Sequence, residues 1–260
     1  PYTTLFRSEY IMQMPKRRIL PTLLNFDVAV LVFFFVGLLI GKVYTTKHFL
    51  LSLIAWESVG NSSWYIFVIL ACYILFYVVN SIVKHEGNGL SLFLLFFVLS
   101  ILGYSLSTVK PEWWYNTLLC FIGGIAYSKN LRGYENKILK YYWLILSLLT
   151  IVLVFLFIAN GDFYCLKYNL FSSIFALWVV VLTMKVQVRS KALTWMGKNL
   201  FPLYIYQRLP MILLSTLGGC GLNSNALLFT VVAFVATLIL AYMYKYIDVN
   251  RVLNTLKINH

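Results

Sequence analysis

The feature that most constrains this chain is a series of long uncharged apolar runs. Val28–Ile40 and Leu144–Ala159 are two of these runs, and neither contains a charged side chain. A helix needs about 20 mostly apolar residues to cross the hydrocarbon core of a bilayer. A transmembrane barrel would show segments of about ten residues with alternating hydrophobicity instead. The runs therefore predict a polytopic helical membrane protein whose first partner is the lipid bilayer.

The amino-acid composition agrees with this prediction. Of the 260 residues, 61% are hydrophobic and only 11% are charged. Soluble domains are about half apolar and about a quarter charged, and disordered chains have the opposite bias. The composition therefore excludes both classes. We expect an all-α transmembrane bundle that forms a single integral-membrane domain over residues 9–260.

The hydropathy pattern predicts eight spanning helices. A further apolar stretch, Lys47–Trp56, is too short to cross a bilayer and is interpreted as an interfacial or re-entrant segment. The fourth and seventh predicted spans are short. The eight spans are Thr22–Gly41, Ser62–Val83, Leu90–Ser107, Trp113–Tyr127, Tyr141–Ala159, Tyr168–Lys185, Leu200–Thr216 and Ala226–Lys245.

The start of the chain is interpreted separately from the fold. The first eight residues, Pro1–Ser8, resemble the translation of a common sequencing-library adapter, and no Met precedes them. We interpret residues 1–8 as a sequencing scar and exclude them from the fold. On this interpretation the remaining residues are the C-terminal part of an open reading frame.

The distribution of cations predicts the orientation of the spans. With Arg7 set aside, alternate loops and ends carry 15 Lys and Arg side chains on one side and four on the other. Cytoplasmic loops carry an excess of Lys and Arg, so residue 9 onward and the C-terminus are expected in the cytoplasm. The net charge of +13 is thus mostly a topology signal. Because the cations are spread over several short loops, we do not expect a nucleic-acid partner.

Familiar catalytic motifs do not occur in this sequence. The four cysteines and three histidines are isolated and lack metal-ligand spacing. The nucleophile elbow, the P-loop and the dinucleotide fingerprint are also missing. The sequence therefore predicts neither a metal site nor a bound cofactor.

The segment Met196–Met211 carries the most unusual chemistry. Pro202 and Pro210 bracket Gln207 and Arg208 within a short apolar span. A charge at mid-depth costs about 2.5–3.5 kcal/mol, and proline frees carbonyls that need another partner. We expect the segment to face a protein interior or a wet cavity, with Gln207 and Arg208 in contact with substrate or with the acyl donor. The alternative is a structural role, either an ion pair, for which Asp27 is a candidate partner, or a link to the freed carbonyls.

Two other groups are candidate binding residues. Lys16, Arg17 and Arg18 precede the first span on its predicted inner side. They form either an anchor for anionic lipid, which sequence alone favours, or a phosphate clamp for a nucleotide-bearing donor such as acetyl-CoA.

On the outer side, Glu57 lies among small polar residues near Trp64 and Tyr65. Polar groups flanked by aromatic rings can bind a sugar. The alternative for Glu57 is an ordinary solvated loop carboxylate.

Four segments together resemble the acyltransferase-3 family of bacterial membrane proteins. Lys16–Pro21 resembles the basic start of its third span, and Cys120–Ile125 resembles its "F-x-x-G" span. Met196–Pro210 resembles its segment with the pattern "Y-l-i-H-x-P". Ser63–Ile69, followed by Tyr73–Tyr77, resembles another span. The resemblance covers roughly residues 14–245.

The resemblance implies a fold and a reaction. Family members have about ten spans, so eight spans here imply two more upstream. They pass acyl groups, often acetyl from cytoplasmic acetyl-CoA, to hydroxyls of sugars and other acceptors at the bacterial inner membrane. The resemblance assigns donor handling to Lys16, Arg17 and Arg18.

The resemblance also implies that a catalytic histidine is missing from this sequence. The family's catalytic histidine belongs to its first span, and no residue here corresponds to it. Gln207 stands where the family commonly has a second histidine. We therefore expect residues 1–260 alone to be inactive and to supply a cavity wall that contains Trp64, Tyr65, Gln207 and Arg208.

Two other functions remain open at this stage. A transporter or flippase for a lipid-linked sugar would also use a proline-broken polar span at mid-depth, although we find no repeat between the two halves. A structural membrane subunit would give no functional role to Arg208 or to the basic residues at 16–18.

Overall fold

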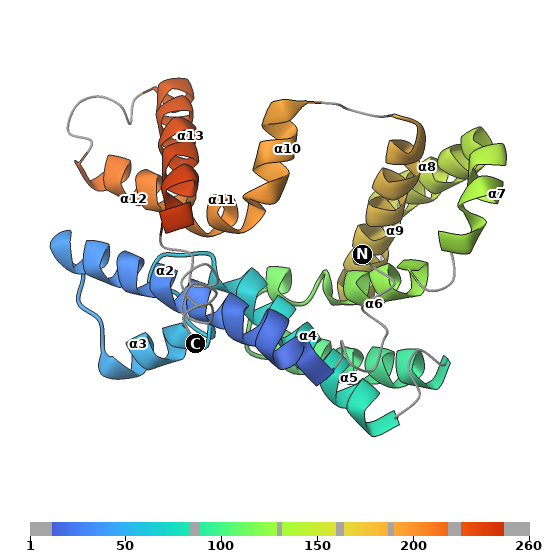
Figure 1. The fold of residues 1–260 in the computed structure, drawn as a ribbon, viewed down its shortest axis with the longest axis horizontal. Helices are drawn as coiled ribbons and strands as arrows, with labels where there is room; N and C mark the ends of the chain where they lie inside the picture. The colour runs from blue at the N-terminus through green and yellow to red at the C-terminus, as the bar shows by residue number, and fades with distance from the viewer. Residues whose placement is uncertain are drawn as a thin grey trace, which may run out of the picture. The chain divides into compact units, whose positions relative to one another are not determined.

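The structure, a computed structural model, describes residues 12–83, 89–128, 132–159, 164–186, 190–217 and 225–246. These residues are almost entirely helical, and no strand occurs among them (Figure 1). The predicted all-α class is therefore confirmed. Residues 1–8, interpreted as a scar, lie outside the described residues.

Six helices coincide with predicted spans. Five helical stretches are long and apolar enough to cross a membrane, namely Met12–Leu39, Ser63–Val83, Gly89–Ser107, Lys167–Lys185 and Ala226–Met243. The helix at 142–158 is apolar but shorter. The total of eight membrane spans stays a prediction. The six helices are α2 (Leu20–Leu39), α4 (Ser63–Val83), α5 (Gly89–Ser107), α8 (Tyr142–Ile158), α9 (Tyr164–Lys185) and α13 (Ala226–Met243).

The other two predicted spans are broken. The fourth consists of a 3₁₀ turn, Glu112–Trp114, and the helix α6 (Leu118–Ala126). The seventh consists of α11 (Leu200–Tyr206) and α12 (Arg208–Leu217), which meet at Gln207. Pro210 has no N–H to donate to the carbonyl of Tyr206, so the hydrogen-bond ladder is interrupted at this place.

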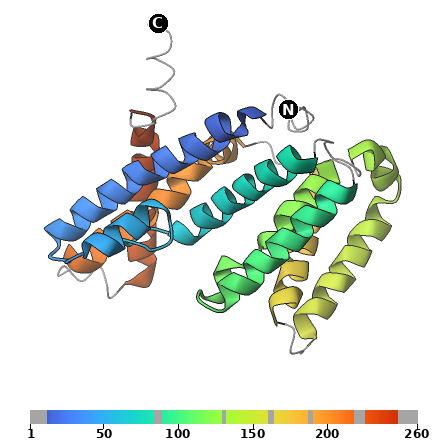
Figure 2. The same ribbon diagram turned by 90° about the horizontal axis from the view of Figure 1, so that it is seen from below.

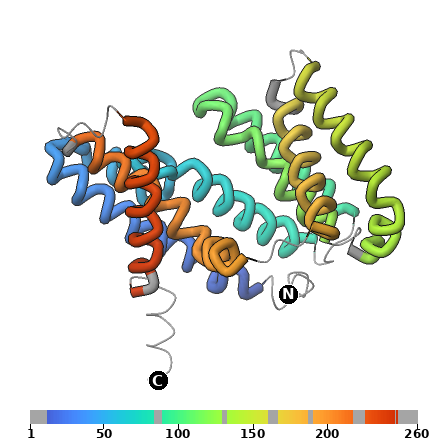
Figure 3. The backbone as a smooth tube through the Cα atoms, turned by 90° about the horizontal axis from the view of Figure 1, so that it is seen from above, coloured from blue at the N-terminus to red at the C-terminus, as the bar shows by residue number. Residues whose placement is uncertain are grey.

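The chain packs as two compact units. One contains residues 71–188, together with 1–15, and the other contains residues 16–70 and 189–260. In the first unit, α9 packs against α8 and α6, and α5 packs against α6. Figure 3 shows α8 and α9 side by side. The short helix α7 (Glu135–Lys140) precedes α8.

A buried amide joins α9 to the start of α6. Asn169, only 4% exposed, accepts a hydrogen bond from the Leu119 N–H at 3.1 Å. Its own amide donates to the Tyr115 carbonyl at 3.0 Å. The first N–H groups of a helix have no partner within the helix, so Asn169 satisfies one of them and the preceding turn together.

The second unit is built on α2. The short helix α3 (Thr46–Leu53) lies alongside α2 (Figure 2). Thr45 caps α3 by accepting a hydrogen bond from the His48 N–H. The rings of Tyr44 and Phe49 lie 5.2 and 4.6 Å from the ring of Phe34 on α2. The stretch interpreted as interfacial or re-entrant thus folds back onto the first long helix.

Tyr44 fixes the turn between α2 and α3. A Cβ on Gly37 would overlap the Tyr44 hydroxyl, so any other residue at 37 would displace the Tyr44 ring. The Tyr44 hydroxyl donates to the Val59 carbonyl at 3.2 Å. Burial raises the pKa of Tyr44 above its usual value, which keeps this donor protonated. The loop that leads into α4 is therefore held against α2.

The apolar core of this unit joins three parts of the chain. Phe26, Val30 and Phe33 on α2 pack with residues of α4 and α11. The helix α11 also packs against α13 and follows α10 (Lys191–Lys198). The core residues from the other elements include Val59, Ile66, Leu70, Ile205, Tyr206, Leu209 and Tyr244.

We predict that Asn169→Ala destabilises the protein. The substitution leaves the Leu119 N–H and the Tyr115 carbonyl without their partner, which costs about 2–4 kcal/mol in the free energy of unfolding. Asn80→Ala is the matched control, because Asn80 is also buried but its amide donates only to the Phe76 carbonyl of its own helix. Thermal unfolding in detergent measures both variants. Equal losses of stability would contradict this role of Asn169.

Candidate functional site

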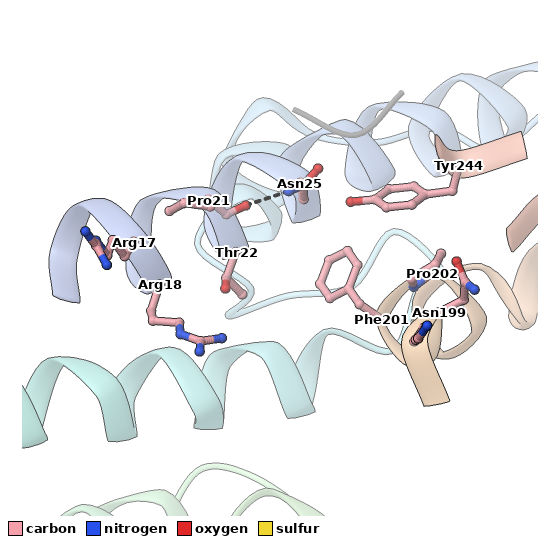
Figure 4. A pocket seen from close by; sticks show the side chains of 10 residues that line it. Arg17, Arg18, Pro21, Thr22, Asn25, Asn199, Phe201, Pro202 and Tyr244 are labelled. Carbon is pink, nitrogen blue, oxygen red and sulfur yellow. Dashed lines mark hydrogen bonds between the residues drawn. The ribbon is translucent and has the colours of Figure 1, made fainter. Parts of the chain in front are cut away.

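A basic pocket lies where α2 begins and α10 turns into α11. The cavity has a volume of about 330 Å³. Figure 4 shows its lining side chains, which come from the π-helical turn before α2, from the start of α2, from the α10–α11 corner and from the turn after α13. The lining residues are Arg17, Arg18, Pro21, Thr22, Asn25, Lys198, Asn199, Phe201, Pro202 and Tyr244.

The local structure explains how these residues meet. A π-helical turn, Pro15–Ile19, carries the basic residues and runs directly into α2. The buried Asn25 amide donates to the Pro21 carbonyl at 2.9 Å, as Figure 4 shows. At the opposite wall, Asn199 ends α10, and its N–H donates to the carbonyls of Met196 and Trp195. Lys198 is thus held at the corner between α10 and α11.

The charge of the pocket is strongly positive. Arg17, Arg18 and Lys198 line it, and the described lining residues include no carboxylate. Arg17 and Arg18 are both exposed. Lys16 is also exposed but is not among the lining residues. The structure therefore brings two of the three basic candidates together with Lys198, 180 residues further along the chain.

Two aromatic rings form another wall of the pocket. The ring centroids of Phe201 and Tyr244 lie 6.0 Å apart. Figure 4 shows both side chains beside the cavity, with Thr22 near them. A cavity with cations and aromatic rings suits a ligand that combines phosphate groups with a planar ring.

A second group of candidate residues gathers around Tyr204. The ring of Tyr65 lies 5.0 Å from the ring of Tyr204, and the ring of Trp64 lies 6.4 Å from it. The Arg208 guanidinium and the Ser62 hydroxyl lie close enough to interact with the Tyr204 hydroxyl. Three sequence candidates, namely Trp64, Tyr65 and Arg208, are therefore brought together. We call these residues, with Ser62 and Tyr204, the Tyr204 cluster.

The sequence did not single out Tyr204, Ser62 or Lys198 as site residues. Tyr204 lies four residues before Arg208, so the two share a face of a helix. This spacing was a signal for Tyr204. Lys198 carried no such signal, because its neighbours in the pocket lie far away in sequence.

Arg208 lies at the break between α11 and α12. The sequence predicted an arginine that faces a protein interior or a wet cavity; its side chain is exposed, so an enclosed interior does not hold it, and the wet cavity stays a prediction. It is the first residue of α12, directly after the break at Gln207. An exposed guanidinium within an apolar span needs water or a polar partner, so Arg208 remains a candidate for contact with a ligand.

The remaining candidates lie apart from the basic pocket. Gln207, half-buried, forms the turn between α11 and α12, and Glu57, also half-buried, follows α3. Asp27 Oδ1 is buried and has no hydrogen-bond partner among the described residues, so an ion pair with Arg208 through this oxygen does not form. Within the same residues, no group of three His, Cys, Asp or Glu side chains is placed to hold a metal ion.

Comparison with protein-family profiles identifies the family of this chain. The family profile described as an acyltransferase domain matches residues 5–246, nearly the whole chain. The chain belongs to the acyltransferase-3 family. The resemblance stated from the sequence motifs is confirmed. No curated protein and no solved structure matched the chain in the comparisons made.

The family and the helices together give a coarse function. The chain is an acyltransferase domain of a multi-pass membrane protein. The basic pocket and the Tyr204 cluster lie in the same unit and are both supplied by α11 and its ends.

Proposed function

We propose that this domain transfers an acyl group, most simply acetyl, from a cytoplasmic acyl-CoA to a hydroxyl of a cell-envelope glycan. The basic pocket is the observation that carries this proposal. Arg17, Arg18 and Lys198 surround one cavity, and its described lining has no opposing carboxylate. The transfer takes place at the bacterial inner membrane, and the pocket opens toward the cytoplasm.

The chemistry of the pocket supports an acyl-CoA donor. Arginine guanidinium groups bind phosphate oxygens through paired hydrogen bonds, and lysine adds a compact charge. The rings of Phe201 and Tyr244 offer a surface for the adenine base. A cavity of about 330 Å³ holds part of such a donor, since small-molecule sites measure about 300–1,000 Å³. An anionic lipid headgroup shares the phosphate chemistry but not the planar base.

The acceptor is assigned to the side of Trp64 and Tyr65, with Glu57 nearby in sequence. A general base removes the proton of the acceptor hydroxyl as its oxygen attacks the acyl carbon. The family resemblance implies a histidine for this base, before residue 1, and Gln207 cannot take its place because an amide does not accept a proton at neutral pH. We therefore propose that residues 1–260 alone have no acyl-transfer activity.

A lipid-linked sugar transporter is the second candidate. It is favoured by one observation, the break between α11 and α12 within an apolar segment, because transporters place broken helices at their binding sites. A transporter moves the sugar without forming an ester, so a labelled acetyl group on the product separates the two functions.

We predict that charge removal in the basic pocket weakens donor binding. Arg17→Gln, Arg18→Gln and Lys198→Gln should each raise the Kd for acetyl-CoA about three- to tenfold, because each loses a charge-assisted contact that solvent partly screens. Lys191→Gln is the matched control, since Lys191 lies on α10 but does not line the pocket. Binding of labelled acetyl-CoA to the detergent-solubilised protein gives the Kd values.

The acetyl-CoA binding experiment also tests whether an anionic lipid competes for the pocket. If vesicle-forming phosphatidylglycerol competes with acetyl-CoA as well as free CoA does, the pocket is a lipid-headgroup site. Absence of acetyl-CoA binding to the unaltered chain would refute the proposed donor site.

We predict that the C-terminus lies in the cytoplasm. A C-terminal green fluorescent protein should fluoresce, and alkaline phosphatase fused at the same place should be inactive, because it folds only outside the cytoplasm. Phosphatase inserted after Lys42, in a loop with few cations, should be active. The reverse pattern would invert the orientation and place the basic pocket on the outer side.

We predict that Arg208→Ala abolishes acyl transfer while expression persists. The assay uses the chain joined to an upstream segment that carries the expected histidine, with labelled acetyl-CoA as donor. Arg208→Lys should retain partial activity, because it keeps the charge and loses the paired donors. Normal transfer by Arg208→Ala would make Arg208 a structural residue.

A further inference from the structure

The hydroxyl of Tyr204 is buried without a clear role in the fold. Its oxygen is shielded from solvent and forms no well-aligned hydrogen bond with a described residue. Buried polar groups nearly always have a partner, so an unpartnered hydroxyl needs an explanation. A ligand that accepts a hydrogen bond is one such explanation.

Two polar groups act on this hydroxyl. The Ser62 hydroxyl and, more weakly, the Arg208 guanidinium interact with it. Both are hydrogen-bond donors, so both favour negative charge on an oxygen that they face. The rings of Trp64 and Tyr65 lie 6.4 and 5.0 Å from the ring of Tyr204.

The Tyr204 cluster lies along the same helical face as a wall of the basic pocket. Phe201, which lines the pocket, precedes Tyr204 by three residues, and Arg208 follows Tyr204 by four. Such spacings place side chains on one helical face. Gln207 keeps helical dihedral angles, so the helical path continues through the break. With a rise of 1.5 Å per residue, Tyr204 lies about 4.5 Å beyond Phe201 and Arg208 about 10 Å beyond it.

An acyl-CoA donor has its phosphates at one end and its thioester at the other. If the basic pocket holds the phosphates, the arm that carries the thioester must extend out of the pocket. Along the face of α11, Tyr204 follows Phe201 within one helical turn. A donor arm that leaves the pocket along this face would pass the Tyr204 cluster.

We propose that the Tyr204 hydroxyl donates a hydrogen bond to the carbonyl oxygen of the bound thioester. This assignment rests on the proposed donor site. It makes Tyr204 a catalytic residue, and Arg208 a positioning residue that strengthens the dipole of the hydroxyl.

The proposed hydrogen bond stabilises the negative charge that develops on the carbonyl oxygen during the reaction. As the acceptor hydroxyl oxygen bonds to the acyl carbon, the carbon–oxygen double bond opens and negative charge develops on the carbonyl oxygen. The carbon–sulfur bond then breaks, the CoA thiolate leaves, and the proton of the acceptor hydroxyl passes to the general base. Tyr204 keeps its proton throughout and stabilises the oxygen by its hydrogen bond.

Tyr206 provides a control on the same helix. Its hydroxyl is also buried and unpartnered among the described residues. Its ring, however, packs in the apolar core, 6.5 Å from the ring of Phe33 and 6.1 Å from that of Tyr244. A Tyr→Phe change at either residue removes one buried hydroxyl and keeps the ring, so general effects on packing are matched.

The experiment compares two unreactive donors and needs no catalysis. In the first, a methylene replaces the thioester sulfur of acetyl-CoA and the carbonyl stays. In the second, S-ethyl-CoA, the carbonyl is missing. Tyr204→Phe should weaken binding of the ketone about three- to tenfold and leave binding of S-ethyl-CoA within about twofold. Tyr206→Phe should change neither Kd by more than about twofold.

Infrared spectroscopy tests the same contact directly. With a ¹³C-labelled ketone, the carbonyl stretch should move to lower frequency on binding to the unaltered protein and should return toward the free value in Tyr204→Phe. If the unaltered chain binds neither donor, the proposed donor site is wrong and this inference is overturned with it. If it binds both, and Tyr204→Phe behaves like Tyr206→Phe, only the role of Tyr204 is overturned.

Discussion

Every backbone N–H and C=O within a bilayer must be satisfied inside the protein, and the rest of this structure follows from that constraint. Long uninterrupted helices such as α2 and α4 meet it without help from side chains. Where the helical ladder stops, other groups must be present. The break at Gln207 is such a place, because Pro210 cannot donate to the carbonyl of Tyr206. Tyr204 and Arg208 of the Tyr204 cluster lie on the two sides of this break.

The helix α11 connects the two candidate regions. Its first turn supplies Phe201 and Pro202 to the basic pocket, and its last turn supplies Tyr204 to the cluster beside Arg208. Ile205, on another face, is fully buried in the core with Phe26. One short helix therefore links the pocket and the cluster, and Ile205 packs it in the core. A donor held at one end would meet the groups at the other end in a defined position.

The sequence predicted the helices better than it predicted the site. Apolar runs of about 20 residues report burial in lipid directly, so the ends of α2, α4, α5 and α13 fall within two residues of the predicted spans. Arg17 and Arg18 were recognised because they are adjacent in the chain. Lys198 was not, because only folding brings residues 180 positions apart to one cavity. Which of the two expected surroundings Arg208 has was open for a related reason, since hydropathy gives the depth of a residue but not the side of the helix that its neighbours cover.

The topology signal and the basic pocket share residues, but the cations differ in their surroundings. Several cations in the loops predicted to be cytoplasmic lie over aromatic rings: Lys137 over Tyr134, Lys140 over Tyr141 and Lys185 over Tyr142. Such pairs suit the headgroup region, where both members prefer to lie. Arg17, Arg18 and Lys198 converge instead on one cavity whose described lining lacks a carboxylate. Like charges repel, so orientation alone gives no reason to collect them, whereas a polyanionic ligand does.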